Sequence, residues 1–364
     1  MNALRDLVTA DAPVWLAAGG LLIGFAFGAI AQRTNFCTMG AISDIMMIRD
    51  WRRLRAWMLA AGTALLGAQL LQWGGVVDLS LSMYLSARFN WSGNIFGGLI
   101  FGFGMVFAGG CASRNLVRAG GGDARALLVL VVIGVLAYVT IGGILGPLRV
   151  MLERATSVSI GLPTQSLGDL LAPHIGMPNP TAQLVTAAAI LLPVLAFCFA
   201  SASFRASPRH VWGGIGIGLA VAAGWFLTGL AFDEMTEWPR PPISLTYVRP
   251  VGDTMEWLER FTAAPLPGFG VATVLGALAG AFVTAILTGS FRVTGFSGSD
   301  DTLRHLMGAA LMGIGGVMAL GCTIGQGISG VSTLAAGSFL AVLSIVLGAV
   351  FGVKALERWI ASED

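Results

Sequence analysis

Long segments with almost no charge are the feature that most restricts how this chain can fold. Nine stretches approach the roughly 20 apolar residues that a helix needs to cross a bilayer. They cover residues 14–33, 54–76, 93–110, 126–147, 181–200, 211–231, 267–289, 304–321 and 333–356. Only 11% of the residues are charged, whereas a soluble domain is usually about a quarter charged. The sequence therefore predicts an all-α polytopic membrane protein with about nine transmembrane helices in a single domain over residues 1–364.

The chain also repeats part of itself. Residues 97–111 and 308–322 match at seven positions with a constant offset of 211, and both end in Gly-Cys. A weaker match links residues 19–24 to residues 213–218. Helices 1–4 then correspond to helices 6–9, five crossings later, so the two halves must have opposite orientations in the membrane.

This correspondence predicts an inverted repeat with a 4+1+4 arrangement of helices. The first repeat covers about 14–148, the linking helix about 181–200 and the second repeat about 211–357. In such transporters the substrate site lies where the two halves meet. The connector over residues 232–266 has apolar residues at helical spacing, which predicts a short amphipathic helix at the membrane surface.

Basic residues in the loops indicate the orientation. When alternate loops are assigned to the two sides, one side collects 14 Lys and Arg residues and the other collects 7. The positive-inside rule then places the N-terminus outside and the C-terminus in the cytoplasm. The arginine cluster at residues 49–55 contributes most to this difference, and we interpret it as an anchor at the cytoplasmic interface.

Three of the four cysteines share a sequence context. Cys37 ends the first span, Cys111 follows the third and Cys322 follows the eighth, and each begins a stretch rich in small residues. Residues 321–353 carry no charge, which is unusual for a loop in water. Such a stretch suits backbone that is buried or lines a cavity, so we predict re-entrant Gly-Cys segments.

Broken helices of this kind could bind an anion. A helix N-terminus carries a partial positive charge, so an anion can dock there without a buried Lys or Arg. A neighbouring thiol is a weak donor that suits a terminal sulfur atom. These arguments select seven candidate substrate-binding residues, namely Cys37, Gly110, Cys111, Asn115, Gly321, Cys322 and Gln326.

Simpler roles remain open for several of these positions. Buried cysteines often behave as small hydrophobic residues, and we assign Cys198 to packing alone. Asn115 and Gln326 could donate hydrogen bonds to substrate oxygens or could form polar contacts between helices. Asp44 and the pair at residues 300–301 could carry protons, although loop or helix-capping roles fit them better.

Several function classes are excluded by what the sequence lacks. It has no Cys-x-x-Cys pair, and none of its three histidines lies near a cysteine in sequence, so we expect no metal site. It has no Walker A motif, so ATP is not the direct driver, and we expect no cofactor. The net charge of +2 argues against a nucleic-acid partner.

The Gly-Cys segments resemble those of the YeeE/YedE family of sulfur-transport membrane proteins. The resemblance is carried by residues 35–40, 109–115 and 321–327. It implies an hourglass-shaped inverted-repeat transporter of the bacterial inner membrane, and not an enzyme. It further implies thiosulfate uptake, with the ion passed between the thiols of Cys37, Cys111 and Cys322. A separate cytoplasmic sulfurtransferase of the TusA type would be the partner.

Two other classes remain as alternatives to thiosulfate uptake. Some members of the family are linked to selenium or to other sulfur species, so the substrate could differ. A membrane thiol-disulfide oxidoreductase would use the same cysteines, although it works best with a resolving thiol nearby in sequence. A channel or scaffold whose cysteines only pack is the third reading.

Overall fold

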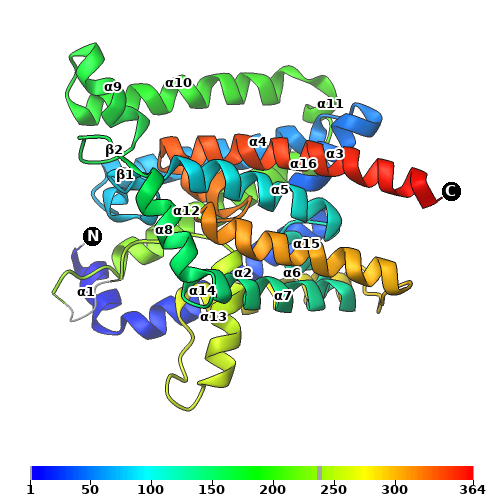
Figure 1. Ribbon diagram of the computed structural model, residues 1–364. Helices are drawn as coiled ribbons and strands as arrows, with labels where there is room; N and C mark the ends of the chain where they lie inside the picture. The colour runs from blue at the N-terminus through cyan, green and yellow to red at the C-terminus, as the bar shows by residue number, and fades with distance from the viewer. Residues whose placement is uncertain (1, 236–239, 364) are drawn as a thin grey trace.

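The computed structural model describes residues 2–235 and 240–363, and most of them lie in helices (Figure 1). Eight segments of this part of the chain are long and apolar enough to cross a membrane. They are Ala12–Ile48 (α2 and α3), Arg52–Trp73 (α4), Gly93–Gly120 (the π-helix η3 at Gly93–Gly97, α5 and α6), Ala124–Ile141 (α7), Asn179–Ala200 (α10), Pro208–Leu230 (α12), Phe269–Leu287 (α14) and Ala336–Trp359, which belongs to α16 (Ala336–Glu363). The predicted all-α polytopic fold is confirmed.

Helix α15 (Ser299–Met318) corresponds to the expected span at residues 304–321. Its first two turns contain Asp300, Asp301, Arg304 and His305, which shortens its apolar part. It nevertheless lies along α5 (Gly98–Phe107) and α7 inside the bundle. The two chain ends lie at opposite ends of the bundle, which requires an odd number of crossings (Figure 1). A crossing through α15, in addition to these eight segments, stays a prediction.

Three of the helical segments are interrupted, and each break precedes a cysteine. Helix α2 (Ala12–Thr34) stops before α3 (Thr38–Ile48), α5 stops before α6 (Ala112–Gly120), and α15 stops before the π-helix η4 (Gly325–Gly330). In each break the residue two positions before the cysteine has a left-handed φ. These residues are Asn35 (53°), Gly109 (70°) and Leu320 (58°). The left-handed residue ends one helix and lets the cysteine begin the next.

The helices pack in a pattern that repeats itself. Helix α2 packs on α14 as α12 packs on α4, and α5 packs on α16 as α15 packs on α7. Helices α5 and α15 cross at repeat-related glycines. A Cβ atom added to Gly97 would lie 2.8 Å from the carbonyl oxygen of Gly315, and one added to Gly104 would lie 2.7 Å from that of Gly308. Any two-fold repeat of helices produces this reciprocal packing, so the inverted orientation and the bounds of the two repeats stay predictions.

Helix α10, the expected linking helix, lies at one edge of the bundle beside α4 (Figure 1). Only 22% of its most apolar stretch is buried inside the protein, so most of its surface is available to lipid. It therefore joins the two halves without enclosing the centre of the bundle.

Short elements fill the connections between the long helices. They are α1 (Asn2–Ala10), η1 (Leu79–Leu81), η2 (Met83–Leu85), β1 (Arg88–Phe89), α8 (Gly146–Thr156), β2 (Val158–Ser159), α9 (Leu167–Ile175), α11 (Ala202–Arg205) and α13 (Val248–Glu259). Strands β1 and β2 form one antiparallel pair. Helix α13 provides the short helix expected within the connector at residues 232–266, of which residues 236–239 lie outside the described part.

Candidate functional site

The three cysteines that share a sequence context come together in the core. Cys111 and Cys322 are 1% and 0% exposed, and Cys37 is partly exposed. The Cys111 thiol lies within interaction range of both the Cys37 thiol and the Cys322 thiol. It also hydrogen-bonds the Ser113 hydroxyl at 3.3 Å. Cys111 is therefore the thiol that has both of the other thiols nearby.

Cys37 and Cys111 occupy the N-cap positions of α3 and α6, and Cys322 lies three residues before the first residue of η4. The backbone N–H of Gly40 donates to the Cys37 sulfur at 3.3 Å, and that of Gly325 donates to the Cys322 sulfur at 3.4 Å. The Cys111 side chain accepts no such hydrogen bond from the first turn of α6. Each cysteine therefore lies near the start of a helical segment, where free N–H groups and the positive end of a helix dipole meet.

The two predicted glycines shape the turns before Cys111 and Cys322. Gly110 has a φ of 151°, which a side chain would strain, and a Cβ atom there would lie 2.9 Å from Cγ of Arg114. A Cβ atom on Gly321 would lie 3.2 Å from the backbone nitrogen of Gln326. Both glycines let the backbone turn tightly beside the thiol.

The two predicted amides brace these turns from equivalent sequence positions. Nδ2 of Asn115 donates to the carbonyl oxygens of Gly110 at 2.7 Å and Cys111 at 3.2 Å. Nε2 of Gln326 donates to the carbonyl oxygen of Ala319. The amide nitrogens are therefore engaged by backbone, while the amide oxygens of both side chains are buried without a partner.

Unpartnered polar atoms gather around the thiols. In the described part of the chain, twelve buried side-chain nitrogen or oxygen atoms lack a hydrogen-bond partner, and six of them belong to residues at or beside the three breaks. The six are Thr38 Oγ1, an Arg114 guanidinium nitrogen, Asn115 Oδ1, Tyr247 Oη, Thr323 Oγ1 and Gln326 Oε1. A buried polar group without a partner costs about 1–3 kcal/mol, so a polar solute bound here would recover that free energy.

A small pocket reaches Cys37. It is lined by Thr34, Asn35, Phe36, Cys37, Arg53, Ala56, His210 and Gly213, and its volume of about 10 Å³ is close to the room that one water needs. Arg53 pairs with Asp44 at 3.3 Å, so this candidate proton site forms an ion pair. Cys37 is the thiol nearest to solvent.

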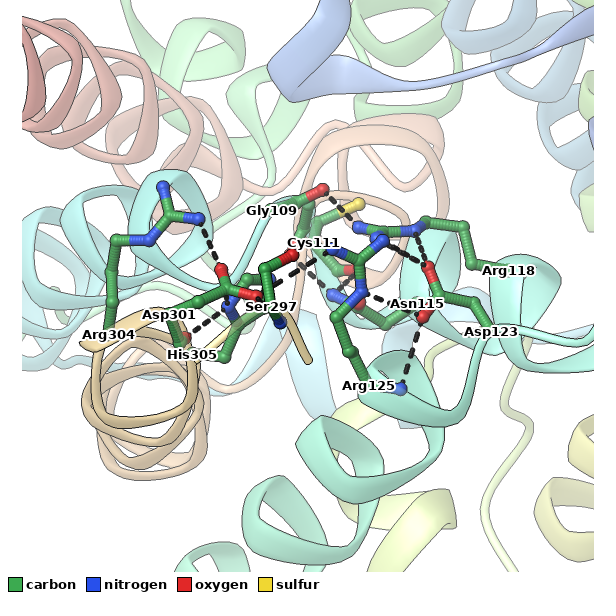
Figure 2. Close-up of polar contacts among 11 residues, drawn as sticks. Gly109, Cys111, Asn115, Arg118, Asp123, Arg125, Ser297, Asp301, Arg304 and His305 are labelled. Carbon is green, nitrogen blue, oxygen red and sulfur yellow. Dashed lines mark hydrogen bonds and ion pairs between the residues drawn. The ribbon is translucent and has the colours of Figure 1, made fainter. Parts of the chain in front are cut away.

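A charged network borders the break before Cys111, as Figure 2 shows. Arg118 donates to the carbonyl oxygen of Gly109 at 2.8 Å and pairs with Asp123 at 2.6 Å. Arg125 links Asp123, at 3.1 Å, to Asp301, at 3.8 Å. Burial raises the pKa of the Asp123 carboxyl, but hydrogen bonds from Arg125 and Arg118 outweigh burial and hold this pKa at about 2.

The same network continues onto α15. Asp301 accepts from Arg304 at 2.8 Å and lies 3.1 Å from Nδ1 of the buried His305. Asp301, another candidate proton site, is therefore bound by several donors, whereas Asp300 is exposed. The network connects α6, α7 and α15 beside the Cys111 break.

Comparison with known proteins identifies the family. The family described as sulphur transport matches residues 33–351, which is most of the chain.

This chain belongs to the sulphur transport family.

Its relatives include two proteins named thiosulfate transporter TsuA. The one from Spirochaeta thermophila is 30% identical over 344 residues, covering 90% of this chain and 96% of the relative. The one from Escherichia coli K12 is 26% identical over 344 residues, covering 90% and 91%. A probable transporter, YedE of Escherichia coli K12, is 27% identical over 101 residues, covering 27% and 23%. The predicted family and the expectation of a transporter, not an enzyme, are confirmed.

In this member of the sulphur transport family, all seven predicted site residues lie in or next to the three helix breaks that contain Cys37, Cys111 and Cys322. Their role in binding stays a prediction. Sequence reasoning did not select Thr38, Thr323, Tyr247 or Arg114. A hydroxyl directly after Cys37 and directly after Cys322 was a usable signal for the two threonines. Nothing local indicates Tyr247, which comes from the distant connector before α13.

The hydrogen-bond donors around the three thiols are weak, and a site made of weak donors is suited to binding and releasing a small soft anion. Thiols and hydroxyls donate weak or moderate hydrogen bonds, and the helix ends supply partial positive charge. Within the described residues no group of three or more His, Cys, Asp and Glu side chains could hold a metal ion. Among those residues, the thiols themselves are therefore the soft groups that a sulfur compound would meet.

Proposed function

We propose that this protein takes up thiosulfate across the bacterial inner membrane, with the ion passing Cys322, Cys111 and Cys37 in that order. The observation that supports this proposal is that the three cysteines come together in the core, with Cys37 and Cys111 at the N-caps of α3 and α6. The names of two relatives over nine-tenths of the chain support thiosulfate as the substrate.

The chemistry of the three thiols suits an ion with one sulfur end and one oxyanion end. A thiol donates a weak S–H···S hydrogen bond to the terminal sulfur, while backbone N–H groups at the helix starts donate to the oxygens. Because each contact is weak, the ion can leave one thiol for the next, which transport requires.

The proposed orientation places the N-terminus outside and the C-terminus in the cytoplasm. Cys37 and its small pocket then lie toward the cytoplasm, and Cys322 lies toward the outside. An anion entering a cell works against about 2.3 kcal/mol per charge per 100 mV of negative potential. A cytoplasmic sulfurtransferase of the TusA type that consumes thiosulfate would keep this import favourable.

Growth on thiosulfate tests the proposal directly. A bacterial strain without its own sulfate and thiosulfate importers would carry the wild type, Cys111→Ser, Cys322→Ser or the control Cys198→Ser, with expression checked for each. We expect growth with the wild type and the control and no growth with the other two. Absence of growth with well-expressed wild type, with and without a TusA-type partner, would point to another sulfur or selenium compound.

The contact between the Cys37 and Cys111 thiols also favours testing one rival, a membrane thiol-disulfide oxidoreductase. That activity would accumulate a Cys37–Cys111 disulfide or a mixed disulfide during turnover. A transporter keeps all four thiols reduced while substrate passes. Mass spectrometry of the protein trapped with an alkylating reagent during uptake separates the two functions.

A further inference from the structure

We propose that Arg114 is the side chain that holds the oxyanion end of the substrate between the thiols of Cys111 and Cys37. The inference rests on the proposed function, because it assumes that an anion passes these thiols. It adds a fixed positive charge to a path otherwise described by thiols, hydroxyls and helix ends.

The position of Arg114 is the first argument. It lies in the first turn of α6, three residues after Cys111, and its charge is within Coulombic range of both the Cys111 and Cys37 thiols. One guanidinium nitrogen lies 3.5 Å from Oδ1 of Asn35, in the break before Cys37. The side chain therefore reaches from one helix break to the other.

The second argument is that Arg114 lacks a partner for its charge. One of its guanidinium nitrogens is fully buried without a hydrogen bond, and no carboxylate lies within ion-pair distance of Arg114 in the described part of the chain. The nearest charges, on Arg118 and Arg53, have the same sign. A buried charge without a partner is strongly unfavourable, so a bound anion would complete this site.

Neighbouring arginines differ from Arg114 in this respect. Arg118 and Arg125 are paired with Asp123, and Arg304 with Asp301, in the network of Figure 2. Arg53, on the other side of Cys37, is paired with Asp44. The acids beside the path are thus taken by these arginines, and the guanidinium between the two thiols is left for a ligand.

The chemistry of this pairing defines the ligand class. A guanidinium presents two parallel N–H groups that match two oxygens of an oxyanion, whereas a thiol suits a terminal sulfur or selenium atom. An ion with both ends can contact Arg114 and a thiol together. A plain oxyanion such as sulfate could use only the arginine, so the combination favours thiosulfate-like ions.

The test uses the purified full-length protein in proteoliposomes and in detergent. Uptake of labelled thiosulfate is measured against concentration for the wild type, Arg114→Gln, Arg114→Lys and Arg358→Gln, a control at an exposed arginine of α16. Apparent Tm is measured for each protein with and without thiosulfate. These two readouts separate ligand binding from a purely structural role.

We expect Arg114→Gln to raise the half-saturating thiosulfate concentration at least tenfold and to abolish the rise in Tm caused by thiosulfate. Its Tm without ligand should equal or exceed that of the wild type, because an unpaired buried charge has been removed. Arg114→Lys keeps the charge but loses the paired N–H groups, so a rise of about three- to tenfold is expected. Arg358→Gln should match the wild type.

Wild-type half-saturation in both Arg114 variants would overturn the inference. A lower Tm with unchanged half-saturation would assign Arg114 a structural role and would also overturn it. If the wild type does not transport thiosulfate, Tm is measured with sulfate, selenate and thiosulfate in turn. Stabilisation by any of them that depends on Arg114 would retain the anion site and reject only the substrate, and its absence would reject the anion site.

Discussion

The side-chain amide of Asn115 donates a 2.7 Å hydrogen bond to the carbonyl oxygen of Gly110, the residue directly before Cys111. Gln326, which is related to Asn115 by the repeat offset of 211, donates in the same way to a carbonyl of the break before Cys322. The two amides therefore fix the positions of two thiols by fixing the backbone that precedes them.

Replacement of Asn115 tests this bracing role. We expect Asn115→Ala to lower the free energy of unfolding by about 1–3 kcal/mol, because the buried carbonyl of Gly110 loses its donor. Thiosulfate uptake should fall at least tenfold because the Cys111 thiol is no longer held in place. Initial uptake rates and thermal unfolding provide the measurements. The exposed Asn179→Ala is the control, and wild-type uptake by Asn115→Ala would contradict the prediction.

Thiol reactivity should follow burial. We expect a small methanethiosulfonate reagent to modify Cys37 at least ten times faster than Cys111, Cys198 or Cys322, since Cys37 is partly exposed beside a pocket. Single-cysteine variants in inside-out and right-side-out vesicles give both the rate and the side of access. Faster reaction from the cytoplasmic side agrees with the proposed orientation, whereas faster reaction of Cys322 than of Cys37 would contradict the proposed order of exposure.

The crossing of α5 and α15 should not tolerate a side chain. In Gly104→Ala the new methyl group would lie 2.7 Å from the carbonyl oxygen of Gly308, so the two helices must separate. Overpacking of this kind costs about 1–3 kcal/mol. We expect a lower Tm and a smaller folded fraction by size-exclusion chromatography. Gly295→Ala, where nothing lies within 4 Å, should leave both unchanged; equal stability of the two variants would argue against close packing here.

The carboxyl of Asp123 should stay ionised through the physiological range. Its pKa of about 2 in the folded protein lies below the ordinary value near 3.9, so its stabilising effect is present above about pH 4 and is lost as pH falls through about 2. We expect Asp123→Asn to lower Tm, because Arg118 and Arg125 lose their shared acceptor.

The pH dependence separates this effect from a general loss of packing. The difference in Tm between the wild type and Asp123→Asn should be constant from pH 8 to pH 5, as measured by thermal unfolding in detergent. The exposed Glu259→Gln serves as the control and should show little difference at any pH. A difference that already disappears at pH 5 would mean that the Asp123 carboxyl is not held at a low pKa.

The helices were the most predictable part of the fold, because apolar length alone defines them. The helix α3 was not predicted, since it depends on the left-handed turn at Asn35, which the surrounding helices fix. The Gly-Cys motif identified the positions of Cys111 and Cys322, and the structure adds that the Cys111 thiol has both of the other thiols nearby.

The polar surroundings of the thiols were harder to predict. The sequence suggested that helix ends could hold an anion without a buried Lys or Arg, yet the charge of the Arg114 side chain lies within interaction range of two of the thiols. Whether an arginine near a helix break is left without an acidic partner depends on which carboxylates pair with the neighbouring arginines. Arg125, for example, pairs with Asp301 of a helix that is distant in sequence. Such contacts between remote segments leave no periodic signal in the sequence.

The reciprocal packing of the two halves limits how the protein can move. Helix α2 packs against α14, α4 against α12 and α5 against α15. Helices of each half therefore pack between helices of the other half. Rocking one half as a rigid body against the other would separate all these pairs at once. Alternating access by a rocking bundle is therefore unsuited to this architecture. The scaffold would stay still while side chains and the three breaks rearrange locally, as in a gated pore.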